Sequence, residues 1–113
     1  MAYLKKYCGP NILEITGGRV KEYCGPFKYE LNGNYIKEYC GRNLYEISGN
    51  YIKEYCGRYL LEVRGNYIKE YCGPIIAEIS GSYIKDYCGP IRYEITGFIA
   101  HRELMMLIAL LYA

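Results

Sequence analysis

The chain of 113 residues fits one small domain, and its net charge of +2 gives no long-range field that would favour nucleic acid or anionic lipid. No charged segment followed by an apolar stretch opens the chain, so we expect no signal peptide. The longest apolar run, residues 104–113, is too short to span a bilayer. We therefore expect a cytoplasmic protein with reduced thiols and no membrane partner.

A sixteen-residue repeat organises the chain from Tyr3 to Phe98. Each of the six units contains two five-residue segments rich in tyrosine and isoleucine, such as residues 35–39 and 43–47, and these segments predict strands. The triplets between the segments contain glycine and predict turns. A short fixed period is typical of stacked architecture, in which each unit buries its apolar positions against its neighbours.

Two all-β folds fit this pattern. In a flattened β-solenoid, six 16-residue coils build two short parallel sheets, and equivalent residues stack about 4.8 Å apart. In an antiparallel β-meander, each triplet is a hairpin turn. Regular turns in the meander would pair Ile36 with Glu46 and place an aliphatic and an acidic residue on one face throughout, which spoils the alternation of a half-buried sheet.

The solenoid gives the cleaner interior, although its stacked glutamates repel one another, and we predict it over the meander. Its first apolar column contains Leu4, Val20, Ile36, Ile52, Ile68 and Ile84. Its second apolar column contains Ile15, Leu31, Ile47, Val63, Ile79 and Ile95.

Stacked coils would also align cysteines and tyrosines into two structural ladders. The cysteine ladder contains Cys8, Cys24, Cys40, Cys56, Cys72 and Cys88, and the tyrosine ladder contains Tyr7, Tyr23, Tyr39, Tyr55, Tyr71 and Tyr87. We expect the cysteines to pack a tight corner as small, semi-apolar side chains; disulfides between coils and a soft metal ion are the alternatives. Zinc needs four converging ligands whereas a column offers a line, so we expect no metal site.

No group of residues indicates catalysis. His101 lies outside the repeat, and no serine or cysteine nucleophile has a histidine near it in the sequence. The lysine in each unit is neutralised by a neighbouring acidic residue, which argues against binding to nucleic acid. We therefore expect no catalytic or cofactor-binding residues, no cofactor and no small-molecule substrate.

The last segment departs from the repeat, so we divide the chain into a six-repeat solenoid, residues 1–98, and a hydrophobic C-terminal helix, residues 99–113. Leucine, methionine and alanine predict a helix from His101 onwards, which would act as a cap or an assembly element. This segment is apolar on all sides over residues 104–111. That pattern predicts burial by another subunit, another partner or a membrane.

The function that we expect is that of a non-enzymatic structural protein that associates with itself, including as filaments, through its solenoid ends and its helix. The expected interface consists of Met1, Ala2, Tyr3, Leu4, Leu104, Met105, Met106, Leu107, Ile108, Leu110, Leu111 and Tyr112. Two alternatives remain open. One is a repeat binding module that presents tyrosine, lysine and glutamate rows to a partner, and the other is a thiol or soft-metal binder that uses the cysteine column.

The units read I-x-x-Y…G…I-x-G and precede a hydrophobic C-terminal helix. In this style, from Tyr3 to Ala113, the sequence resembles small bacterial short-repeat β-solenoid proteins of uncharacterised function. The resemblance implies a solenoid and brings no activity and no functional residues with it.

Overall fold

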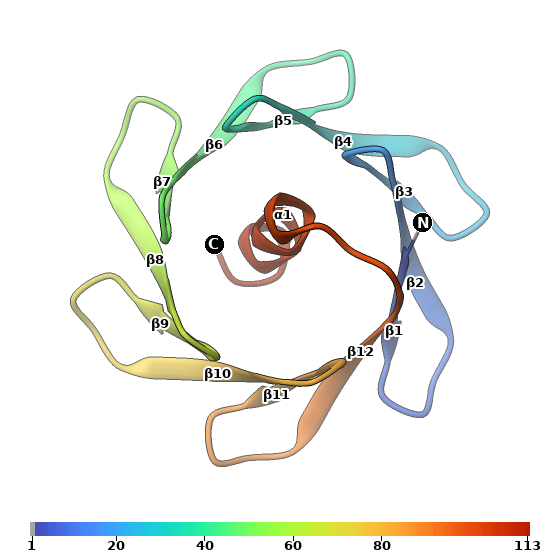
Figure 1. Ribbon diagram of the computed structural model, residues 1–113. Helices are drawn as coiled ribbons and strands as arrows, with labels where there is room; N and C mark the ends of the chain where they lie inside the picture. The colour runs from blue at the N-terminus through green and yellow to red at the C-terminus, as the bar shows by residue number, and fades with distance from the viewer. Residues whose placement is uncertain (1) are drawn as a thin grey trace.

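Twelve antiparallel strands form a closed barrel around one helix in the computed structural model, which describes residues 2–113 (Figure 1). The helix is α1 (His101–Tyr112). The strands, in chain order, are β1 (Ala2–Lys6), β2 (Asn11–Thr16), β3 (Arg19–Glu22), β4 (Phe27–Asn32), β5 (Tyr35–Glu38), β6 (Asn43–Ser48), β7 (Tyr51–Glu54), β8 (Tyr59–Arg64), β9 (Tyr67–Glu70), β10 (Ile75–Ser80), β11 (Tyr83–Asp86) and β12 (Ile91–Gly97).

The predicted parallel solenoid is wrong, because every strand pairs antiparallel with its neighbours in sequence. The reason lies in the register of the strands. Ile36 lies opposite Tyr45, and Tyr35 lies opposite Glu46, because the register shifts by a bulge between Ile36 and Lys37. A shift of one residue moves every side chain to the other face of a sheet. The conflict between aliphatic and acidic residues that argued against a meander is therefore absent.

The apolar positions expected in two columns form rings around the barrel interior instead. Ile47 pairs with Ile52 across two strands, and the same pairing recurs between Val63 and Ile68. The first set is completely buried at all six positions: Leu4, Val20, Ile36, Ile52, Ile68 and Ile84. Most of the second set is buried as well, so the barrel interior is the hydrophobic core.

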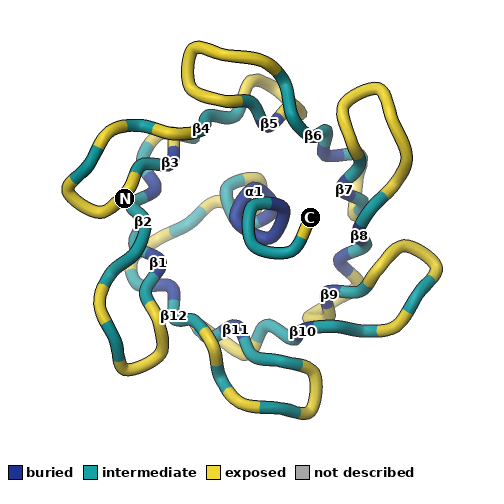
Figure 2. The backbone as a smooth tube through the Cα atoms, turned by 180° about the vertical axis from the view of Figure 1, so that it is seen from behind, coloured by how far each residue is buried: buried dark blue, intermediate teal, exposed yellow. Residues whose placement is uncertain are grey.

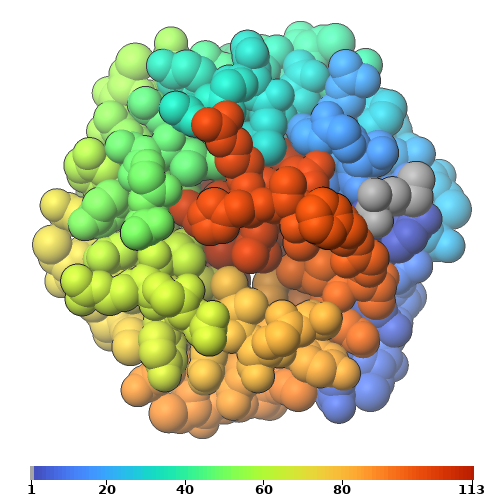
Figure 3. Space-filling model, in the orientation of Figure 1, coloured from blue at the N-terminus to red at the C-terminus, as the bar shows by residue number. Residues whose placement is uncertain are grey.

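Helix α1 runs through the middle of the barrel, and Figure 2 shows its buried face surrounded by the strands. Met105, Met106, Leu107, Ile108 and Ala109 have no exposed surface. The helix begins at His101, as its composition predicts. The segment is apolar on all sides because strands of the same chain surround it, and Figure 3 shows it filling most of the mouth of the barrel.

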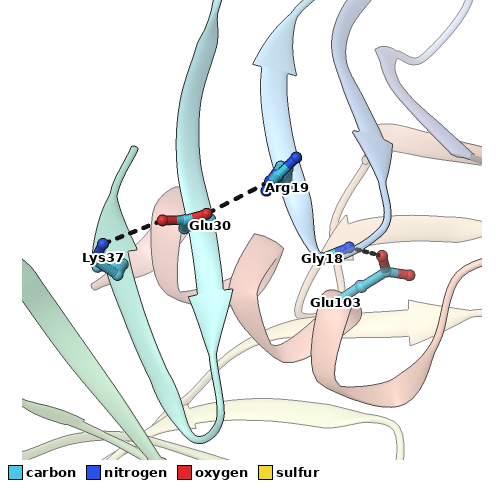
Figure 4. Close-up of polar contacts among 5 residues, drawn as sticks. All are labelled: Gly18, Arg19, Glu30, Lys37 and Glu103. Carbon is cyan, nitrogen blue, oxygen red and sulfur yellow. Dashed lines mark hydrogen bonds and ion pairs between the residues drawn. The ribbon is translucent and has the colours of Figure 1, made fainter. Parts of the chain in front are cut away.

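Two polar contacts hold the start of this helix against the wall. The carboxylate of Glu103 accepts hydrogen bonds from the backbone N–H of Gly18 (2.8 Å) and of Ala100 (3.0 Å). The first bond joins the helix to the turn between β2 and β3 (Figure 4). Nη1 of Arg102 donates to the carbonyl oxygen of Gly33 (3.1 Å), in the turn between β4 and β5.

The ring has no open end, because β1 pairs with β12 over five residue pairs, from Ala2 opposite Gly97 to Lys6 opposite Tyr93. The solenoid ends expected to carry self-association are therefore absent. Of the expected interface residues, Ala2 and Leu4 are buried in the wall and residues 105–108 are buried in the core. Tyr3, Leu104, Leu110, Leu111 and Tyr112 are partly exposed, and Met1 lies outside the described residues.

Two kinds of loop connect the strands. Short turns with a glycine at positive φ, such as Gly49 at 62°, join the end of one unit to the start of the next. Longer loops with the sequence Tyr-Cys-Gly join the two strands of each unit and project outward around the barrel (Figure 1). The molecule is a flat disc of 38 × 33 × 17 Å with six outward hairpins.

Candidate functional site at the outer edge

Each outward hairpin ends in a tight turn that is fixed by its backbone. In the hairpin between β5 and β6, the N–H of Gly41 donates to the carbonyl oxygen of Glu38 (2.9 Å), and the N–H of Glu38 donates to the carbonyl oxygen of Arg42 (2.9 Å). A side chain at Gly41 would lie 2.9 Å from Cβ of Glu38, which is too close for any residue except glycine. The turn therefore needs its glycine, and it places the preceding cysteine at the tip.

The cysteine at every tip has a backbone conformation that suits cysteine poorly. Its φ lies between 54° and 57° in all six units, in the left-handed region that glycine and asparagine favour. All six thiols are exposed and free. The prediction that the cysteines form a stacked ladder and pack a tight corner is therefore wrong, since they form an outward ring instead.

The thiols are too far apart to react with one another within the chain. In a regular hexagon, neighbouring tips are as far apart as each tip is from the centre, which is half the disc width of 33–38 Å, or about 16–19 Å. A disulfide needs Cα atoms within about 7 Å. Within the described part of the chain, no three histidine, cysteine or acidic side chains come close enough together to hold a metal ion.

Six tyrosines, each next to a tip cysteine in the sequence, lie along the same outer edge of the disc. They are 38–47% exposed and comprise Tyr7, Tyr23, Tyr39, Tyr55, Tyr71 and Tyr87. We call these six tyrosines and the six cysteines the tyrosine–cysteine belt. The tyrosines do not stack as a ladder; each contacts a residue near the start of a strand in the preceding unit. Tyr55 lies edge-on to Tyr35 with 5.5 Å between the ring centroids.

Five of the six junctions between hairpins have this contact between two rings, and the sixth has a cation–π contact instead. The ring pairs are Tyr3 with Tyr23, Tyr35 with Tyr55, Tyr51 with Tyr71, Tyr67 with Tyr87 and Tyr83 with Tyr7, at 5.5–5.9 Å between centroids. At the sixth junction the guanidinium of Arg19 lies 5.7 Å from the ring centroid of Tyr39. Such contacts each contribute roughly 0.5–1.5 kcal/mol, so the belt tyrosines stabilise the junctions and still expose much of each ring.

In three of the six units, the neighbouring cysteine raises the pKa of the belt tyrosine. The pKa of Tyr7 is raised above its usual value, first by the charge of the Cys8 thiolate and then by a hydrogen bond to Cys8. The same two causes raise the pKa of Tyr71 beside Cys72 and of Tyr87 beside Cys88. A raised pKa keeps these phenols protonated to a higher pH, so each remains a possible hydrogen-bond donor beside its cysteine.

The repeated lysines and glutamates form ion pairs on the outer wall, in place of the basic stripe and the stacked glutamate column of a solenoid. Nζ of Lys37 lies 3.1 Å from Oε1 of Glu30, whose other oxygen lies 3.5 Å from Nε of Arg19 (Figure 4). The hydrogen bond from Lys37 is the main cause that lowers the pKa of Glu30. Equivalent pairs of Lys5, Lys53, Lys69 and Lys85 lie at 3.7–4.0 Å.

Six positions are identical in all six units, and five of them have a structural explanation. The lysine and glutamate form the outer ion pairs, the tyrosine joins neighbouring hairpins, one glycine fits a turn with no room for a side chain, and the other takes positive φ. The cysteine alone has none, because its thiol is exposed and its backbone favours another residue. Equal spacing reveals the cysteines in the sequence, but nothing in it indicates that they lie at exposed tips.

Apart from the belt, the surface has a hollow at one mouth of the barrel. It has a volume of about 470 Å³ and is lined by Leu44, Tyr45 and Leu60 with Arg42, Glu54, Tyr55 and Ala113. Its two charged residues already have partners, since Nε of Arg42 donates to Glu38 (3.2 Å) and Nε of Arg58 donates to Glu54 (3.2 Å). A smaller hollow of about 320 Å³ occupies the equivalent place between the last and the first unit, where Lys6, Tyr7, Ile91, Arg92 and Tyr93 line it. The belt residues recur in all six units, so we regard the belt as the better candidate site.

The fold and the belt define a closed antiparallel barrel that encloses a helix and presents six thiols at its edge. No protein-family model matches this chain, and neither a curated protein nor a solved structure was found that is similar to it. No helix within residues 2–113 combines the length and the apolar character needed to cross a membrane.

Proposed function

We propose that this protein is a non-enzymatic structural protein that associates with other copies of itself through the tyrosine–cysteine belt. The observation that carries the proposal is the exposed cysteine at all six tips, which the fold does not require. Self-association is the use that we expect from the sequence, but the surface differs. The outer edge replaces the solenoid ends and the helix.

The belt tyrosines support this use because tyrosine gives a large, rigid and amphipathic contact surface at a low cost in side-chain entropy. Six equivalent tips also allow one copy to contact several others at once, which strengthens weak individual contacts. The outer wall beside the belt alternates lysine and glutamate, so two identical edges meet without a large net repulsion.

The test is the mass of the full chain in reducing buffer, measured by light scattering after size exclusion from micromolar to millimolar concentration. The wild-type mass should rise with concentration above 13.1 kDa. The double variant Tyr7→Asp and Tyr55→Asp, which changes two opposite tips, should shift this rise to higher concentration. Phe98→Ser is the matched control, because Phe98 is an apolar side chain that is 80% exposed and lies outside the belt. A wild-type chain that stays monomeric throughout would overturn the proposal.

A further inference from the structure

Resting on that proposed function, we propose that the belt thiols are sites of disulfide exchange that join copies of this chain, tip to tip, into a flat hexagonal sheet. Each copy would be linked to as many as six neighbours. The partner is a second copy of the chain, and the reaction is the oxidation of two cysteines from different molecules.

The spacing of the tips makes the pairing intermolecular. Neighbouring thiols within one disc are separated by about 16–19 Å, half of the disc width, whereas a disulfide holds its Cα atoms about 5.5 Å apart. Each cysteine lies on an outward hairpin, and all six are exposed. A cysteine of this kind can therefore pair only with a thiol outside its own chain.

The arrangement of the tips determines the shape of the product. The six hairpins leave the disc at similar intervals around one ring, and the disc is only 17 Å thick (Figure 1). Six equivalent links that leave a disc in its own plane fill a plane with hexagonal packing. Adding the span of one disulfide to the disc width of 33–38 Å gives a distance between centres of about 40 Å.

The chemistry needs an oxidant, and a small-molecule disulfide such as oxidised glutathione supplies it. The thiolate of a belt cysteine attacks one glutathione sulfur, the glutathione S–S bond breaks, and one glutathione thiolate leaves and takes up a proton. A belt thiolate of a second copy then attacks the cysteine sulfur of this mixed disulfide and releases the second glutathione. Two protein thiols are oxidised and one glutathione disulfide is reduced to two thiols.

The tip is suited to this exchange. The thiolate is the attacking species, and a tyrosine directly precedes the cysteine at every tip. Because the tip cysteines are exposed, the sulfur is open to an in-line approach by another disulfide.

The experiment treats the full chain with oxidised glutathione and examines the product by electron microscopy and non-reducing electrophoresis. The wild-type chain should form sheets with a repeat of about 40 Å that disperse on reduction. One variant keeps only Cys8 and Cys56, which lie on opposite sides of the ring, and combines Cys24→Ser, Cys40→Ser, Cys72→Ser and Cys88→Ser. This variant should form unbranched single-file chains. A second variant keeps only Cys8 and Cys24, which are neighbours, and should form small closed rings.

The control changes all six cysteines to serine, with circular dichroism to verify that the barrel is intact. It should gain no mass on oxidation. Association in reducing buffer tests the proposed function, whereas the change on adding oxidant tests only the disulfide step, so the two can fail separately. Wild-type chains that take up six glutathiones, seen by intact mass, without forming cross-links would overturn the inference. Cross-links of identical size and shape in the two variants with two thiols would overturn the planar geometry.

Discussion

Cysteine is an unusual choice for the residue at each hairpin tip. A left-handed backbone brings Cβ close to the following carbonyl oxygen and costs about 1–2 kcal/mol for most residues, while asparagine and glycine tolerate it better. The chain repeats this choice six times, with φ near 55° each time. The backbone is therefore strained slightly at the positions where the thiol is presented.

Replacing the tip cysteine should consequently not harm the fold. We expect Cys56→Asn to raise the free energy of unfolding by up to about 1 kcal/mol, because asparagine adopts positive φ more easily. Urea unfolding in reducing buffer measures this. Cys56→Ala retains the strain and serves as the control, with little change expected. A loss of more than about 1 kcal/mol in Cys56→Asn would mean that the thiol packs against the protein after all.

A second prediction at this scale concerns Glu30, whose carboxylate is shared between Lys37 and Arg19. Its pKa in the folded chain is lowered below the ordinary value of 4.5. A carboxyl with a lowered folded pKa stabilises the protein above its unfolded pKa, and this contribution is lost as the pH falls through the folded pKa. The contribution is therefore present at neutral pH and declines below 4.5.

We expect Glu30→Gln to lower the free energy of unfolding at about pH 7, and to lower it by less at about pH 3, where the wild-type carboxyl is largely protonated as well. Urea unfolding at both pH values measures the two differences. Glu38→Gln is the control, because the Glu38–Arg42 pair is more exposed and should contribute less. Equal losses at both pH values would contradict the assignment.

At the scale of the elements, the sequence predicts the pieces well and their pairing badly. The expected strands at residues 35–39 and 43–47 correspond to β5 and β6 within one residue at each end. Alternation also identifies the interior positions, such as Ile36 and Ile52. Alternation does not predict the bulge between Ile36 and Lys37, because a shift in register does not change the amino-acid composition of a strand.

The candidate site shows the same limit. The spacing of the cysteines is visible in the sequence, but their position at exposed tips depends on the hairpin turn, which only the antiparallel register creates. A parallel coil with the same residues would have placed the thiols in a line. The choice between corner packing and presentation therefore could not be made from Cys8 or its counterparts alone.

Helix α1 is the element on which the core depends most. Its position in the interior predicts that Ile108→Ala will lower the free energy of unfolding by about 2–5 kcal/mol, because a completely buried side chain leaves a cavity in the core. Thermal or urea unfolding measures the loss. His101→Ala changes an exposed residue of the same helix and should alter stability by no more than about 0.5 kcal/mol. Equal effects of the two substitutions would place the helix outside the barrel.

At the scale of the whole molecule, the number of units is matched to the helix. The diameter of a barrel grows with the number of its strands, so the circle that twelve strands close has room for one helix. A barrel of ten strands would have a narrower interior. The repeat therefore sets the width of the core, although no single unit carries that information.

Deleting residues 34–49 tests this match, because the new junction of Gly33 with Asn50 restores the same turn sequence. We expect the shortened chain to leave part of α1 uncovered, with a lower melting temperature and increased binding of a hydrophobic dye. The control is the full-length chain with Asn34→Ser in the same turn, a substitution that copies the serine found at the equivalent position, Ser82. A shortened chain that melts like the wild type and binds no dye would show that the barrel does not need six units.

The seam between β1 and β12 sets the order of events while the protein is being made. Residues 2–6 leave the ribosome well before residues 93–97, so the barrel cannot close until nearly the whole repeat has been translated. The apolar helix α1, which fills the barrel, emerges after β12, when all the strands that surround it are available. A nascent chain that makes its apolar helix after the strands leaves that helix exposed for a shorter time.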